Sequence, residues 1–214
     1  MRFYIIGGDH SIAFGSVAAA LKTNPDVGVI WVDAHADLNT PLTSPSGNMH
    51  GMPLGILMHL YDPSTIPGFE WMSDIPKLKP EQLSYIGLRD VDQGEANFVR
   101  ELGIQTFTMH HIDLYGIGGV VDQVLDHQGD RPLHMSYDID AVDPIEAPST
   151  GTVVRGGLTF REAHYVAEAV SDTGNLKSMD IVEVNPQLEP GEGANMTADM
   201  GLQLTLSAMG TRIL

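Results

Sequence analysis

The chain has 214 residues, of which 43% are hydrophobic, enough for a single domain over 1–214 with a sizeable core. Its formal net charge of −17 argues against nucleic acid as a partner, because the chain would repel phosphate backbones. No apolar run reaches the length of a membrane span, and none resembles a secretory signal. The absence of cysteine excludes disulfides and thiolate metal sites. We therefore expect a cytoplasmic protein that contacts no membrane.

Short apolar runs alternate along the chain with segments of helical composition. The expected strands are Phe3–Ile6, Val27–Val32, Leu83–Leu88, Ile104–Phe107, Leu133–Tyr137 and Met179–Val182. The expected helices are Ile12–Leu21, Gly55–Leu60, Glu95–Leu102, Val120–His127, a segment from a capping box at Thr159 to about Gly174, and Thr197–Met209. This alternation predicts an α/β fold around a mostly parallel sheet.

Three possible metal ligands follow the strand that ends at Val32. Asp33, His35 and Asp37 stand at every second position, and alternate side chains of an extended strand point to the same side. Two carboxylates and one imidazole form an oxygen-rich site that suits manganese or magnesium. A polar loop without a metal is the alternative interpretation of this motif on its own.

Polar residues also follow other predicted strands. His10 follows the first strand, Asp138 and Asp140 end the fifth with the same spacing of two, and Glu183 follows the sixth. Ligands of parallel sheets bind beyond the carboxyl ends of the strands. We therefore expect these residues to share one site with the Asp33 motif. Asp92, after the third predicted strand, is expected there too.

Four aspartates and two histidines around one point require counter-charge, because neighbouring carboxylates raise one another's pKa. Two divalent ions would balance four carboxylates, and ion pairs at roughly 3.5–4 Å activate water. The residues therefore predict metal-assisted hydrolysis, with a structural metal site as the alternative. The long polar connection over 38–51 favours a functional site, because long loops at strand ends often carry function.

Several motifs resemble those of the ureohydrolases, which include arginase, agmatinase and formiminoglutamase. The three signature motifs are matched by Gly7–Ser11, Asp33–Asp37 and Ser136–Pro144. The arginase branch is resembled more closely than the agmatinase branch by Ser46–Gly51, Gly87–Asp92 and Glu183–Pro186. The similarity runs from Tyr4 to the end of the chain. It implies a three-layer α/β/α fold.

The resemblance also implies a centre with two Mn²⁺ ions. One ion would be held by His10, Asp33, Asp37 and Asp138. The other would be held by Asp33, His35, Asp138 and Asp140. A hydroxide between the ions would attack the guanidinium carbon of L-arginine and give L-ornithine and urea.

Further roles are implied by matching positions. Glu183 corresponds to the partner of the substrate guanidinium and His50 to a proton shuttle, and Asp37 is counted with both as catalytic. The remaining positions that resemble substrate contacts are Asn39, Ser44, Ser46, Asn48, Asp92, Glu95 and Thr152. At Ser44 the family usually has threonine.

Family members normally carry a longer segment before the first signature motif, so we expect an N-terminally shortened fold. A natural short form, an engineered minimal form and a gene fragment all fit this expectation. Phe3–Ile6 would then be an edge strand with unpaired backbone groups, and self-association into a homo-oligomer could cover it. The alternatives to arginase are agmatinase or another ureohydrolase, and an inactive metal-binding or oligomeric module.

Overall fold

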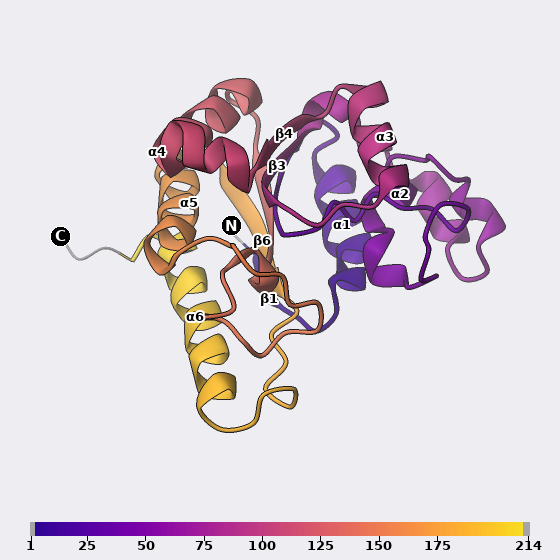
Figure 1. Cartoon of the computed structure of the whole chain (residues 1–214). Helices are drawn as coiled ribbons and strands as arrows, with labels where there is room; N and C mark the ends of the chain where they lie inside the picture. Colours follow the sequence, from indigo (N-terminus) through magenta and orange to yellow (C-terminus); the bar gives the residue numbers. More distant parts are fainter. Residues whose placement is uncertain (1–2, 212–214) are drawn as a thin grey trace.

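A computed structural model describes residues 3–211 of the chain (Figure 1). Within them lies one six-stranded sheet of order β1-β6-β5-β2-β3-β4, in which every neighbouring pair is parallel. The strands are β1 Phe3–Ile6, β2 Gly28–Val32, β3 Leu83–Leu88, β4 Gln105–Thr108, β5 Leu133–Asp138 and β6 Leu176–Val182. The α/β fold with a parallel sheet is confirmed.

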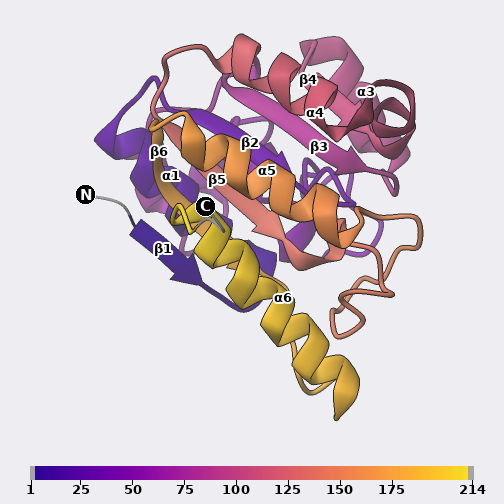
Figure 2. The ribbon, with the colours of Figure 1, turned by 90° about the vertical axis from the view of Figure 1, so that its left-hand side faces the viewer.

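Helices cover both faces of this sheet. They are α1 Ala13–Thr23, α2 Pro53–Leu57, α3 Gln93–Leu102, α4 Met109–Gln128, α5 Phe160–Asp172 and α6 Glu192–Ala208. Figure 1 shows α4, α5 and α6 on one side and α1, α2 and α3 on the other, and Figure 2 looks onto the α4–α6 layer. The three-layer arrangement is therefore present.

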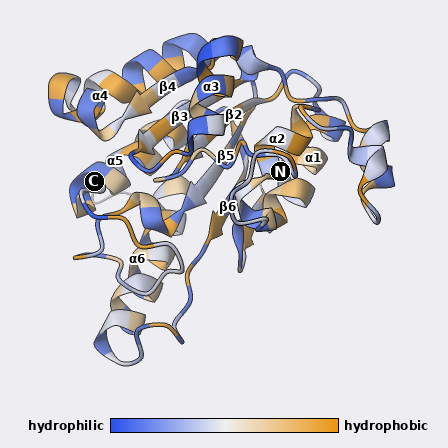
Figure 3. Cartoon of the chain, turned by 45° about the vertical axis from the view of Figure 1, so that its right-hand side comes forward, coloured by the Kyte–Doolittle hydropathy of each residue, from blue (hydrophilic) through white to orange (hydrophobic). Residues whose placement is uncertain are grey.

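The two core clusters follow from the alternation of side chains along the central strands. In β2, Ile30 and Val32 belong to the core under α4, α5 and α6, whereas Val29 and Trp31 belong to the core with α1 and α2. All five residues of β2 are buried, as expected for a parallel strand covered on both faces. Figure 3 shows the covering helices with both hydrophobic and hydrophilic parts, as a half-buried helix requires.

β1 is an edge strand of the described sheet, as predicted. It pairs with β6 alone, and Phe3 and Ile6 are 57% and 69% exposed. No helix among residues 3–211 combines the length and apolar character needed to cross a bilayer.

Several predicted helix boundaries were wrong. α4 begins at Met109 instead of Val120. It has two helical parts joined by a kink at Gly116, whose φ is 70° and ψ is 158°, and the glycine-rich sequence around this kink gave no helical pattern. α2 ends at Leu57, and His59 has a φ of 55°, which is incompatible with the helix predicted up to Leu60.

The other differences lie near the end of the chain. α6 begins at Glu192 instead of Thr197, and β6 begins at Leu176 instead of Met179. The exposed Lys177 interrupts the apolar run of β6, so the start of this otherwise mostly buried strand was not predicted.

Gly55 in α2 allows the loop after β2 to approach the helix closely. A Cβ at this position would lie 2.2 Å from the carbonyl oxygen of Asn39 and 2.9 Å from that of Leu38. Both contacts are to backbone, so the loop that carries pocket residues would have to move. We predict that Gly55→Ala lowers the free energy of unfolding by about 1–3 kcal/mol in urea denaturation.

Gly15 in α1 provides the matched control. A Cβ there meets nothing within 4 Å, so Gly15→Ala should be neutral or stabilise the protein by up to about 1 kcal/mol. Equal denaturation midpoints for the two variants would contradict the prediction.

Candidate metal centre

The predicted ligands meet at the carboxyl edge of the sheet. Asp33 follows β2, and Asp138 ends β5 beside it, because Val32 pairs with Tyr137 in the parallel ladder. His10 begins a short 3-10 helix after β1, and Asp140 lies in another one after β5. Parallel register therefore brings together residues that are far apart in sequence.

Strand alternation is the wrong reason for this grouping. β2 ends at Val32, so Asp33, His35 and Asp37 lie in the following loop, and Asp37 has a φ of 47°. Left-handed backbone is uncommon for aspartate and marks a conformation held by its surroundings. The three residues do stand at every second position, but the turn after β2, not strand alternation, brings their side chains together.

The first group surrounds the imidazole of His10, which is 1% exposed. Its Nδ1 lies 3.2 Å from Asp33 Oδ2, 3.1 Å from Asp37 Oδ2 and 3.0 Å from Asp138 Oδ2. This buried nitrogen has no hydrogen-bond partner. Three carboxylate oxygens and an unpartnered imidazole nitrogen around one point suit a divalent cation.

The second group shares Asp33 with the first. His35 Nδ1 lies 3.4 Å from Asp33 Oδ1 and 3.2 Å from Asp140 Oδ2. The donor atoms of Asp33, His35 and Asp140 all lie within 4.8 Å of one another. Asp138 contacts the first group through Oδ2, and its Oδ1 accepts a hydrogen bond from the backbone of Asp140 at 2.8 Å.

The carboxylates of the two groups oppose one another's ionisation. Burial and the charge of Asp33 raise the pKa of Asp37 to about 7. Burial, followed by the charges of Asp140 and Asp33, raises the pKa of Asp138 well above its usual range, and burial and Asp33 also raise that of Asp140. Positive charge among them would relieve this repulsion, so the donor set fits two divalent ions.

Contacts from below hold the shared ligand and His10. Trp31 Nε1 donates to Asp33 Oδ2 at 2.9 Å, and its ring stacks on His10 with centroids 4.1 Å apart. The backbone N–H of His35 donates to Asp33 Oδ1 at 2.7 Å. Burial alone would raise the pKa of Asp33, but its contacts with His10 and His35 lower it overall. Asp33 is therefore an ionised and tightly oriented acceptor.

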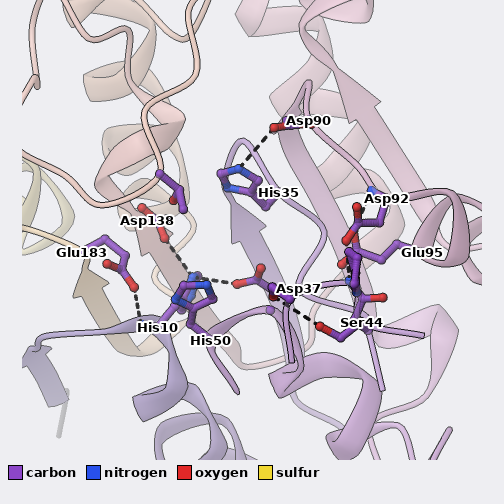
Figure 4. A pocket seen from close by; sticks show the side chains of 15 residues that line it. His10, His35, Asp37, Ser44, His50, Asp90, Asp92, Glu95, Asp138 and Glu183 are labelled. Atoms are coloured by element: carbon purple, nitrogen blue, oxygen red, sulfur yellow. Dashed lines mark hydrogen bonds and ion pairs between the residues drawn. The ribbon is translucent and has the colours of Figure 1, made fainter. Parts of the chain in front are cut away.

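A cavity of about 260 Å³ opens above these groups (Figure 4). Of the predicted site residues, its walls contain His10, His35, Asp37, Asn39, Ser44, Ser46, His50, Asp92, Glu95, Asp138, Thr152 and Glu183. Asn48 is not among the lining residues, and its backbone N–H donates to Ser46 Oγ at 3.1 Å. Pro45, Gly51 and Asp90 also line the cavity and were not predicted. Gly51 and Asp90 lie inside the motifs Ser46–Gly51 and Gly87–Asp92, and Pro45 lies in the polar connection over 38–51, which are the signals that could have indicated them.

Glu183 and His50 are far apart in sequence, and both line the cavity (Figure 4). Glu183 has a φ of 62°, its N–H donates to the carbonyl of Gly8, and its Oε1 accepts from the His10 backbone at 2.7 Å. Burial raises its pKa. His50 Nδ1 lies 3.4 Å from Asp9 Oδ2.

Glu95 and Thr152 are already occupied by protein partners. Glu95 accepts from the backbone of Leu38 and of Asp92, each at 2.9 Å, and burial raises its pKa to about 7. Thr152 Oγ1 donates to Asp140 Oδ2 at 2.7 Å. Glu95 thus anchors the pocket loop to the start of α3, and Thr152 orients a candidate metal ligand.

Comparisons with known proteins identify the family of this chain. The model of the Arginase family matches residues 1–210. The arginase of Emericella nidulans is 52% identical over 98% of this chain and 66% of its own length, and Arginase-1 of Homo sapiens is 44% identical over 96% and 65%. The chain therefore spans slightly less than two thirds of the length of these curated relatives.

Solved structures agree. The arginase of Bacillus caldovelox superimposes with a TM-score of 0.91 at 41% identity, covering 100% of this chain and 70% of that one. The arginase of Bacillus subtilis gives 0.88 at 41% identity, covering 99% and 71%. The chain belongs to the arginase family.

Proposed function

We propose that this protein is a manganese-dependent arginase, which hydrolyses L-arginine to L-ornithine and urea. The observation that carries the proposal is the buried Nδ1 of His10, unpartnered among three carboxylate oxygens, next to a second group that shares Asp33. Relatives that share about half of its residues are named arginase, which supports the substrate.

The residues present fit two Mn²⁺ ions. When bound, the ions would lower the pKa of a water molecule and so supply the nucleophile at mild pH. The first ion would be held by His10, Asp33, Asp37 and Asp138. The second would be held by Asp33, His35, Asp140 and, from the family resemblance, Asp138. Hard carboxylate oxygens favour manganese over softer metals.

Glu183 is suited to hold the substrate guanidinium. Its carboxylate faces the cavity beside His10, and a carboxylate can pair with a guanidinium through two parallel hydrogen bonds. The left-handed backbone at this residue fixes the direction of the side chain. Asp37 also lines the cavity, so this assigned ligand would lie near the bound guanidinium.

His50 is suited to proton transfer at the cavity rim. It is partly exposed, and its Nδ1 lies beside the carboxylate of Asp9, which leaves Nε2 available to the cavity or solvent. An imidazole exchanges protons readily near neutral pH, so it can return a proton to the leaving amine.

The far end of the cavity would recognise the amino-acid part of the substrate. Hydroxyl and amide groups that can donate to an α-carboxylate are those of Asn39, Ser44, Ser46 and, outside the cavity wall, Asn48. Asp92 offers a carboxylate for the α-amino group, and Glu95 accepts a hydrogen bond from its backbone. Thr152 lines the cavity beside Asp140. These donors would distinguish arginine from agmatine, which has no carboxylate.

Self-association and location complete the proposal. Exposed apolar side chains lie on β1 and on α6, including Phe3, Ile6, Leu202 and Leu206, and burial of such surface would favour a homo-oligomer. A cytoplasmic location stays a prediction and is based on the lack of cysteine in the sequence.

The direct test is urea release by manganese-loaded protein with arginine and agmatine side by side. We expect turnover of arginine and at most trace turnover of agmatine. The reverse preference would replace the proposal with agmatinase. Manganese binding without turnover of either substrate would show a metal-binding module instead.

Asp138→Ala tests the ligand assignment. Loss of a ligand assigned to both ions should reduce bound manganese and abolish urea release, as measured by metal analysis and the same assay. Asp126→Ala, which removes an exposed carboxylate on α4, is the control and should retain both. Full activity of Asp138→Ala would contradict the assignment.

Glu183→Gln tests recognition of the guanidinium. The neutral amide should weaken a partly buried charge-assisted pair by about 2–3 kcal/mol, which is about 30- to 150-fold in kcat/KM for arginine. Manganese content should not change, because Glu183 is not an assigned ligand. An unchanged KM and kcat would exclude this role.

A further inference from the structure

A chain of buried hydrogen bonds lies behind His10, on the side away from the three carboxylates. His10 Nε2 lies 2.9 Å from Ser136 Oγ, and Ser136 Oγ donates to Asp180 Oδ1 at 2.5 Å. Ser136 and Asp180 are 0% exposed. The chain thus connects the first group of candidate ligands to a carboxylate on β6 that has no place in the proposed reaction.

Asp180 is built to act as an acceptor. Besides Ser136, its carboxylate accepts hydrogen bonds from the hydroxyl of Ser16 and, at 3.1 Å, contacts His134 Nε2. His134 Nδ1 in turn lies 2.8 Å from Ser178 Oγ. Three neighbours that can donate to one buried carboxylate compensate for the water it has lost, so it can remain ionised without a Lys or Arg partner.

The direction of the hydrogen bonds follows from the number of protons. Ser136 has one hydroxyl proton, and its short bond to an ionised carboxylate uses that proton. Ser136 Oγ can therefore only accept from His10, so His10 carries its proton on Nε2. A neutral imidazole with a proton on Nε2 has a lone pair on Nδ1. Nδ1 is the atom that faces the three carboxylates without a hydrogen bond.

We propose that Asp180, acting through Ser136, is a positioning residue that keeps the proton of His10 on Nε2 and so presents Nδ1 to a metal ion. The inference rests on the proposed metal centre and adds a residue that touches neither metal nor substrate. Contacts with His134 and Ser16 stabilise the ionised carboxylate of Asp180, which accepts hydrogen bonds. The arrangement acts on the first group alone, because no hydrogen bond joins Asp180 or Ser136 to His35 in the described part of the chain.

Asp180→Asn is the principal test because it preserves shape and changes the proton order. An amide nitrogen facing Ser136 would donate to its oxygen, so the hydroxyl would turn to donate to His10 Nε2 and favour a proton on Nδ1. In manganese titrations followed by calorimetry and metal analysis, we expect two ions per wild-type chain. The variant should keep one ion and bind the other about 10- to 100-fold more weakly.

Ser136→Ala should weaken binding of the same ion, since it breaks the hydrogen-bonded connection between His10 and Asp180 while leaving Asp180 in place. Ser207→Ala is the matched control. It also removes a serine that contacts a histidine, at 2.9 Å from His164 Nδ1, but in a partly buried position between α5 and α6. It should bind both ions as the wild type does. Circular dichroism and thermal melts verify that each variant is folded.

If folded Asp180→Asn binds each of the two ions as tightly as the wild type does, the inference is overturned and the proposed function is left intact. Absence of manganese binding by the wild type would instead overturn the proposed function. The tautomer can be measured without any variant binding data, by ¹⁵N NMR of chelator-treated wild-type protein, with His10 assigned from His10→Gln. The three carboxylates beside Nδ1 raise the pKa of His10, so Nδ1 can also hold a proton while the metal is absent. A proton on Nε2 is therefore the expected signal, and an Nε2 without a proton would refute the inference.

Discussion

Repulsion between buried carboxylates is the constraint on which this structure depends. Asp33 and Asp138 leave neighbouring parallel strands at the same level, and Asp37 and Asp140 join them from the following turns. Burial deprives these groups of water and makes each charge more costly to its neighbours. Divalent cations reverse the sign of that interaction, so the arrangement that opposes ionisation of the carboxylates is one that binds metal strongly.

The surroundings of the ligands restrict them to few orientations. Trp31 stacks on His10 and donates to Asp33, backbone N–H groups hold Asp33 and Asp138, and Ser136 contacts His10 from behind. Such support lowers the cost of organising ligands when an ion binds. The opposite wall differs, because it is formed by a loop whose serines, Ser44 and Ser46, are at least partly exposed and can adapt to a substrate. The tightly held ligands at the sheet edge suit metal binding, and the polar loop across the cavity suits substrate recognition.

Much of the architecture was predictable because it is encoded locally. Apolar runs predicted all six described strands, and their alternation with helices predicted the parallel sheet. Helix boundaries were less predictable: the kink at Gly116 and the left-handed backbone at His59 depend on packing around the helices. The grouping of Asp33, His35 and Asp37 was also predicted, but strand alternation was not its cause. A turn with a left-handed Asp37 brings them together, and no sequence period encodes such a turn.

The sequence by itself determined which residues end the strands, which faces of the strands are apolar, and that oxygen-rich ligands recur at strand ends. Only the tertiary structure decided that Asp37 has a left-handed backbone, that Glu95 anchors a backbone loop, and that Asp180 lies behind His10 through Ser136. The physical reason is the order of the strands. β1, β6 and β5 are adjacent in the sheet although His10, Asp180 and Ser136 are far apart along the chain, and distances of that kind leave no local pattern.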